Sequence, residues 1–163
     1  MYFKHTFFAL TLGLLSLNLT SAAQSIQASK WADSVYQKLN NRERIAQMIM
    51  VAAYSGTKKQ NDSLIRHYIK NRQIGGVIFM QGGPIRQARL TNEWQSSAQV
   101  PLLIAMDAEW GLGMRLDSVK NFPKQMQLGA TQNPDFAYYI GASIAQQCKL
   151  LGVHINFGPV VDV

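Results

Sequence analysis

Two carboxylates, an indole and a guanidinium lie close together in this chain, at Asp107, Glu109, Trp110 and Arg115. They directly follow the apolar run Leu102–Met106, whose pattern is typical of a fully buried strand. A carboxylate can accept hydrogen bonds from sugar hydroxyls, an indole offers a flat apolar face, and a guanidinium donates in a fork to oxygen atoms. The combination indicates a carbohydrate site. An ion pair between Asp107 and Arg115 that only ties down the loop explains the same residues equally well.

The two carboxylates are not predicted to form a catalytic pair. A retaining glycosidase needs two carboxyl groups about 5–5.5 Å apart, on opposite sides of the bond that it cleaves. Asp107 and Glu109 are separated by a single residue, so both would approach a sugar from the same side. We therefore expect them to bind substrate rather than to cleave it.

Alternating strands and helices must position these residues. Four apolar stretches have the composition of buried strands: Met50–Ala53, Ile74–Met80, Leu102–Met106 and Val153–Val161. Caps or a proline mark where the helices between and before them begin: Asn41, Asp62, Pro84 and Asn133. After Asn41, the residues expected to face inward are Ile45, Met48 and Ile49. Residues 107–131 are expected to form a long loop, and Gly152 to end the last helix.

This alternation predicts an α/β fold with a parallel sheet and about four βα units. Two architectures fit it, an open doubly wound sheet and a (β/α)₈ TIM-type barrel. In both, ligands bind beyond the carboxyl ends of the strands, where Asp107 is expected. A complete barrel needs about 250 residues, so we expect the N-terminal half of a barrel within a longer protein. A small complete α/β domain is the alternative.

The first 23 residues have the pattern of a signal peptide. Lys4 and His5 precede the apolar run Phe7–Leu19, and small residues up to Ala23 suit cleavage. The apolar run is too short to favour a membrane span. We therefore expect an exported protein, periplasmic or secreted, whose folded domain covers residues 24–163.

The net charge, the single cysteine and the histidines limit the other classes of function. The net charge is +7, but the basic residues are spread along expected helices, so solvated helix faces are favoured over a nucleic-acid site. The single cysteine, Cys148, is expected to be a buried hydrophobe rather than a nucleophile. His154 is expected in the packed core and His67 on the surface. No metal-ligand spacing is present, and we expect no metal or organic cofactor.

Four segments carry a resemblance to a known family: QIGGVIFMQGG, PLLIAMDAEWGLGMRL, FPKQMQLGAT and LGVHINFGPVVDV. Together with the order of the elements, they resemble the N-terminal barrel domain of glycoside hydrolase family 3. The similarity runs from about Trp31 to Val163. Among subgroups it is closest to the β-N-acetylhexosaminidase branch, with the β-glucosidases as the neighbouring branch.

The resemblance implies roles for five residues. Asp107 matches the substrate-binding aspartate of the family, and Arg115 matches a second substrate contact in the hexosaminidase branch. Glu109 fits the family pattern, whereas Trp110 stands where a glycine is common. Asp162 lies in the family's Pro-Val-x-Asp segment at a strand end and is expected to shape the site.

The resemblance also implies an activity and places its catalytic groups elsewhere. A retaining exo-glycosidase would remove a terminal β-linked sugar, taken from an oligosaccharide or from peptidoglycan, and would need no cofactor. The family's Lys-His-Phe-Pro-Gly-His-Gly segment, the acid/base histidine and the nucleophilic aspartate are all expected beyond Val163. This chain alone is therefore expected to be inactive.

Two other classes of function would use residues of the same chain. A non-catalytic module that binds sugar or peptidoglycan would use the same residues around Asp107. A nucleotide-binding domain would use Gln81–Pro84 as a phosphate loop at a helix start. That loop has no Walker lysine and no G-x-G-x-x-G pattern, and Pro84 removes one backbone donor, so we do not favour it.

Overall fold

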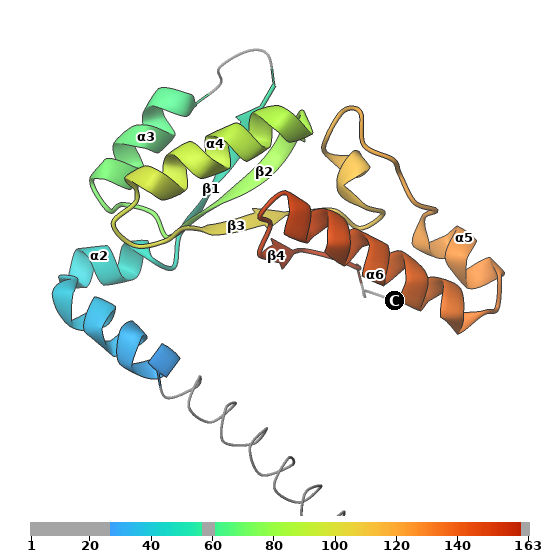
Figure 1. Ribbon diagram of the computed structural model, residues 1–163, viewed down its shortest axis with the longest axis horizontal. Coiled ribbons are helices and arrows are strands. Elements are labelled where there is room, and N and C mark those ends of the chain that lie inside the picture. Colours follow the sequence, from blue (N-terminus) through green and yellow to red (C-terminus); the bar gives the residue numbers. More distant parts are fainter. Residues whose placement is uncertain (1–26, 57–60, 161–163) are drawn as a thin grey trace, which may run out of the picture. The chain divides into compact units, whose positions relative to one another are not determined.

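The computed structural model describes residues 27–56 and 61–160 (Figure 1). The chain divides into two compact units, residues 1–40 and 41–163. In the first unit, residues 27–38 are helical; the expected signal peptide lies outside the described residues. In the part of the chain that the structure describes, no helix combines the length and hydropathy that a membrane crossing requires.

The second unit is built on a four-stranded parallel sheet in the order β1-β2-β3-β4 (Figure 1). The strands are β1 Met50–Ser55, β2 Gly76–Gly82, β3 Leu103–Met106 and β4 Ile155–Asn156. The helices are α2 Asn41–Ala46, α3 Asp62–Lys70, α4 Pro84–Ser97, α5 Gln125–Ala130 and α6 Pro134–Leu150, with a short 3₁₀ helix, η1, at Leu112–Met114. The predicted parallel α/β fold is confirmed.

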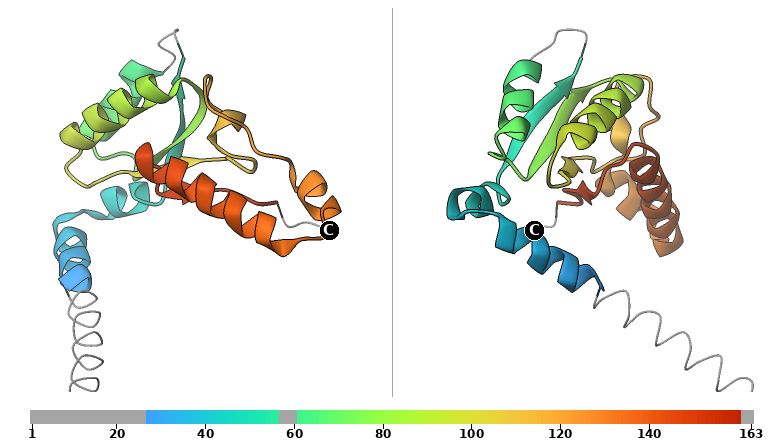
Figure 2. Two further views of the ribbon diagram at one scale, coloured as in Figure 1. Left: turned by 45° about the vertical axis from the view of Figure 1, so that its right-hand side comes forward. Right: turned by 60° about the vertical axis from the view of Figure 1, so that its left-hand side comes forward.

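Helices α3 and α4 cover one face of the sheet (Figures 1 and 2). On that face Phe79 stacks on Trp94 of α4 with ring centroids 5.7 Å apart, and both side chains are fully buried. Stacked rings in a closed core remove a large apolar area from water. On the opposite face of β3, Leu103 is 46% exposed, whereas Ala105 is fully buried.

Several local sequence signals for helix starts and ends are confirmed by the structure. Pro84 occupies the first turn of α4, and the Asn133 side chain accepts a hydrogen bond from the Asp135 N–H at 2.9 Å to cap α6. Gly152 ends that helix with a φ of 65°, a conformation that glycine adopts at little cost. His67 is on the surface, and Cys148 is buried, as expected.

Four predictions about the helices are wrong. Asn41, which was expected to cap α2, is the first residue of that helix. Helix α2 ends at Ala46, before its expected inward residues Met48 and Ile49, which are exposed together with Ile45. Asp62 is the first residue of α3 rather than its cap, because Asn61 takes that position with a φ of 62°. The segment expected as one long loop contains η1 and α5.

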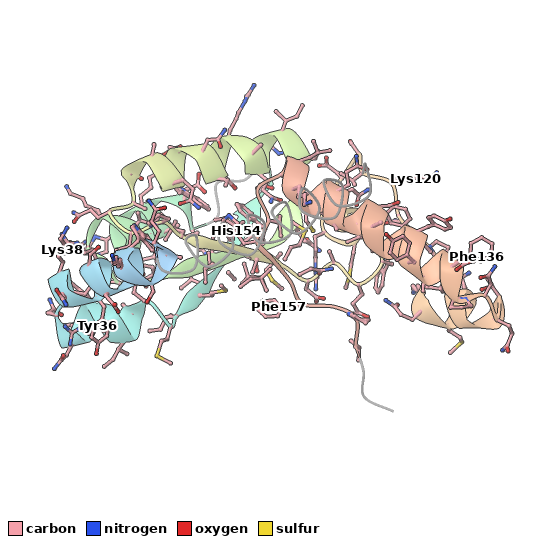
Figure 3. The ribbon with its side chains drawn as sticks, turned by 60° about the horizontal axis from the view of Figure 1, so that its bottom comes forward. Tyr36, Lys38, Lys120, Phe136, His154 and Phe157 are labelled. Atoms are coloured by element: carbon pink, nitrogen blue, oxygen red, sulfur yellow. The ribbon has the colours of Figure 1, made fainter. Side chains whose placement is uncertain are left out.

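The fourth strand and its histidine also differ from expectation. β4 covers only Ile155–Asn156 of the predicted Val153–Val161, and Pro159 further along has no N–H to donate to a ladder. His154 is exposed rather than packed in the core (Figure 3). It lies just before the edge strand, where its Nδ1 accepts the Ile104 N–H at 3.0 Å. The ring therefore acts as a substitute for a main-chain acceptor.

Candidate functional site

The carboxyl ends of the parallel strands meet at one edge of the sheet, and the candidate site is built there. Asp107 follows β3 directly, and the loop that it begins runs across to the end of β2. There Gly82 donates to the Arg115 carbonyl at 3.1 Å and accepts from the Asp117 N–H at 2.7 Å. The loop is therefore pinned beside β2 like a short additional strand.

Asp107 and Arg115 form the centre of the site. The Arg115 Nε donates to the main-chain carbonyl of Asp107 at 2.9 Å, and its terminal nitrogen is ion-paired with the Asp107 carboxylate. The Asp107 and Arg115 side chains are 29% and 18% exposed. A half-buried pair of this kind keeps one face of the carboxylate available to a ligand while the guanidinium holds its orientation. The structure brings together the two residues that the sequence singled out first.

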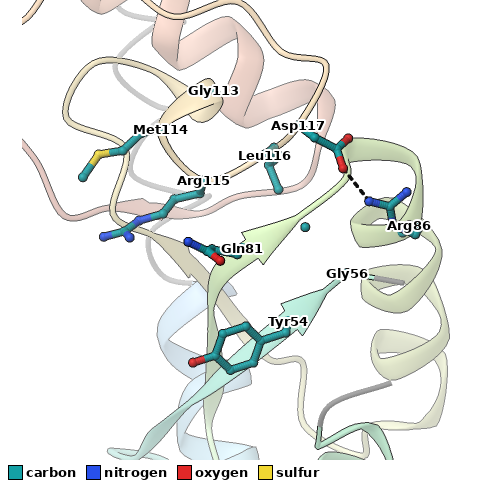
Figure 4. A pocket seen from close by; sticks show the side chains of 10 residues that line it. Tyr54, Gly56, Gln81, Arg86, Gly113, Met114, Arg115, Leu116 and Asp117 are labelled. Carbon is teal, nitrogen blue, oxygen red and sulfur yellow. Dashed lines mark hydrogen bonds and ion pairs between the residues drawn. The ribbon is translucent and has the colours of Figure 1, made fainter. Parts of the chain in front are cut away.

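A second ion pair fixes the outer side of the loop. Arg86 donates to the Asp117 carboxylate at 2.6 Å and, through Nε, to the Ser55 carbonyl at 2.6 Å (Figure 4). Ser55 is the last residue of β1, so α4 ties that strand to the loop. The loop that carries Arg115 is therefore held to β2 through Gly82 and to β1 through Arg86.

At two positions of the site, neighbouring atoms lie so close to the backbone that glycine is favoured. Gly82 has a φ of 150°, and a Cβ there would overlap the Ser55 side chain and main chain. Gly111 has a φ of 92° and faces the Phe122 ring. Both conformations favour glycine, because L side chains rarely adopt them.

Two amide side chains from distant segments hold the loop after Asp107. Asn156 of β4 accepts the Ala108 N–H at 3.0 Å and donates to the Ala108 carbonyl at 3.3 Å. Gln147 of α6 accepts the Leu112 N–H at 3.2 Å. Sequence reasoning missed both residues, because neither lies near the loop along the chain.

The other expected site residues are placed differently from Asp107. The Glu109 carbonyl accepts from the Gln125 side chain at 2.9 Å, and Glu109 lines a cavity of about 510 Å³ beside α6 and His154. Over the Trp110 ring, the Lys124 Nζ lies 5.1 Å from the centroid, so one stacking face already holds a cation. Asp162 lies outside the described residues.

Arg115 lines a different cavity, of about 540 Å³, together with Tyr54, Gln81 and Met114 (Figure 4). In the part of the chain that the structure describes, no three acidic, histidine or cysteine side chains are grouped to hold a metal ion. Burial raises the pKa of the Cys148 thiol above its ordinary value, which disfavours the thiolate.

Comparison with known proteins relates this chain to proteins that act on glycosides, both by sequence and by fold. The pattern of the glycosyl hydrolase family 3 N terminal domain matches residues 40–163. A beta-N-acetylglucosaminidase/beta-glucosidase of Cellulomonas fimi is 24% identical over 149 residues, which are 90% of this chain and 26% of that protein. Beta-hexosaminidase A of Pseudoalteromonas piscicida is 34% identical over 108 residues, which are 58% of this chain and 18% of that protein.

Solved structures extend the likeness to the backbone. A beta-glucoside phosphorylase, BglX, has a TM-score of 0.69 at 20% identity, over 82% of this chain and 23% of that one. The same kind of enzyme bound to 2FGlc has a TM-score of 0.66 at 21% identity, over 82% and 24%. The fold is therefore that of four βα units of a TIM-type barrel, as predicted. This chain spans 18% to 26% of the length of these four chains.

Proposed function

The chain belongs to glycosyl hydrolase family 3, and on that premise we propose that it supplies the sugar-binding part of a retaining exo-glycosidase. The proposed substrate is a terminal β-linked N-acetylhexosamine, carried on an oligosaccharide or on a peptidoglycan fragment. The names of the curated relatives support this choice, since a hexosaminidase and a beta-N-acetylglucosaminidase/beta-glucosidase are among them. The predicted signal peptide supports an exported protein.

The paired Asp107 carboxylate at the strand ends is the observation that carries the proposal. Arg115 occupies one side of the carboxylate, and the remaining lone pairs can accept hydrogen bonds from two sugar hydroxyls. The Asn156 side chain is hydrogen-bonded to Ala108, the residue after Asp107. The carboxylate is therefore already ordered before the sugar binds. Preorganisation of this kind lowers the cost of binding.

In the proposed reaction Asp107 and Arg115 hold the sugar and do not break the bond. A nucleophilic carboxylate attacks the anomeric carbon to give a glycosyl-enzyme, which water then hydrolyses with retention. We assign the nucleophile and the acid/base histidine to segments of the gene product beyond Val163. Glu109, Trp110 and Asp162 remain proposed substrate-site residues.

The test compares the complete gene product with this chain of 163 residues. The complete product should hydrolyse nitrophenyl β-N-acetylglucosaminide and lose that activity in the Asp107→Ala variant. This chain alone should not turn the substrate over. Measurable hydrolysis by this chain that Asp107→Ala abolishes would contradict the division of roles.

The double name of the Cellulomonas fimi relative favours one second candidate, a β-glucosidase activity at the same site. Nitrophenyl β-glucoside in the same assay decides between the two sugars. If the complete product cleaves neither substrate but binds N-acetylglucosamine in calorimetry, a non-catalytic sugar-binding function replaces both.

A further inference from the structure

The parallel pairing of β1 and β2 contains an irregularity close to the site. Ala53 pairs with Phe79, but the next residue, Tyr54, pairs with Gln81, so Met80 is an extra residue on β2. Such bulges re-aim the side chains that follow them and occur often beside active sites.

The bulge determines the face on which Gln81 lies. In regular alternation, Gln81 would share the face of Phe79, where α4 buries the sheet. Pairing with Tyr54 moves it to the opposite face, because Tyr54 follows the fully buried Ala53 on β1. An amide that would have been buried without partners under α4 is therefore presented at the strand ends.

Three polar side chains share one cavity there. Tyr54, Gln81 and Arg115 line the cavity of about 540 Å³, and in Figure 4 their polar ends extend toward one side, away from the Arg86–Asp117 pair. Gln81 is exposed and Tyr54 is half-buried. Within the described residues, no side-chain hydrogen bond to Tyr54 or Gln81 is present, so both can receive a ligand.

We propose that Tyr54 and Gln81 form a second binding surface for the substrate, connected to Asp107 through Arg115, which lines their cavity and pairs with that carboxylate. A phenol and a carboxamide can each donate and accept. A hydroxyl or an acetamido group of a sugar does the same, so both side chains can pair with the polar groups of a pyranose. This inference rests on the proposed function and deepens it.

The experiment measures steady-state kinetics of the complete gene product on the nitrophenyl β-N-acetylglucosaminide and β-glucoside. Gln81→Ala and Tyr54→Phe remove the amide and the hydroxyl. Gln146→Ala and Tyr138→Phe are matched controls, because both residues are exposed on α6 and line neither cavity. Each site variant should raise KM at least fivefold with little change in kcat, since a contact made equally in the ground and transition states affects binding alone.

Two results would overturn the proposal. One is a KM within twofold of the unchanged protein for both site variants, with melting temperatures showing that they are folded. The second applies if the complete gene product hydrolyses neither substrate, and calorimetry with N-acetylglucosamine then replaces the kinetic measurement. Binding that Gln81→Ala weakens at least fivefold supports the surface although the hydrolase proposal has failed, whereas absent or unaltered binding removes the surface as well.

Discussion

Arg115 holds Asp107 twice, through its main-chain carbonyl at 2.9 Å and through its carboxylate. The two residues lie at opposite ends of one loop, and the loop is pinned to Gly82 of β2 beside Arg115. The guanidinium thus joins the ends of β2 and β3. The contact to the main-chain carbonyl fixes the backbone at the end of β3, and the contact to the carboxylate fixes the orientation of the Asp107 side chain.

The first prediction concerns the fork of Arg115. Arg115→Lys keeps the charge, but a single ammonium cannot reproduce two donors in fixed geometry. We expect kcat/KM of the complete gene product to fall by roughly 10- to 150-fold, which corresponds to the 1.5–3 kcal/mol of a charge-assisted hydrogen bond. The control is Arg89→Lys on the exposed side of α4. Equal kinetics in the two variants would show that the second contact has no functional role.

The second prediction concerns the grip of Asn156 on Ala108. Asn156→Ala leaves the N–H and the carbonyl of fully buried Ala108 without their partners. The free energy of unfolding should fall by about 1–3 kcal/mol for each group that stays unsatisfied. Urea denaturation measures it, with exposed Asn92→Ala of α4 as the control. A loss below about 0.5 kcal/mol, the usual limit for a surface change, would mean that water replaces the amide.

The fold was largely predictable because its signals are local. Apolar runs such as Leu102–Met106 identify strands without any knowledge of their neighbours, and Pro84 and Asn133 mark helix starts through chemistry within one turn. The pairing of Asp107 with Arg115 was predictable for a similar reason, since they are only eight residues apart.

The missed features depend on register between distant segments. Asn156 reaches Ala108 across 48 residues, and only the pairing of β3 with β4 brings them together. The bulge at Met80 changes the face of Gln81 without any mark in the alternation of apolar residues. The apolar neighbours of His154 predict a core position, but the side chain precedes β4, the last strand of the described sheet, and is exposed.

The third prediction tests the backbone conformation at Gly82. In Gly82→Ala a Cβ would meet the Ser55 side chain and main chain at a φ of 150°. Overpacking and strain each cost about 1–3 kcal/mol, so the melting temperature should drop by several degrees. Gly129→Ala in α5 is the matched control, because nothing lies within 4 Å of its Cβ position. That variant should be stabilised by about 0.5–1 kcal/mol, as is usual for alanine in place of glycine within a helix.

The fourth prediction concerns the pH dependence that Cys148 imposes. Burial raises the pKa of this thiol above its ordinary value of 9.0. The folded state therefore holds the proton more tightly than the unfolded state. Its contribution to stability is complete below the ordinary pKa and is lost as the pH rises through the folded pKa. Between pH 8 and pH 10, the free energy of unfolding should fall more steeply for the unchanged protein than for Cys148→Ala. Both proteins contain the same lysines, so the difference between the two curves removes the contribution of lysine titration.

Alkylation of the thiol gives an independent measure of the same burial. At pH 8, iodoacetamide should modify Cys148 more slowly in the folded protein than in urea, because the thiolate is the reactive species and is disfavoured in the fold. A folded protein that reacts as fast as the unfolded chain, with parallel stability curves for the two variants, would show that Cys148 is open to solvent. It would also show that the cavity beside α6 admits small molecules as far as that thiol.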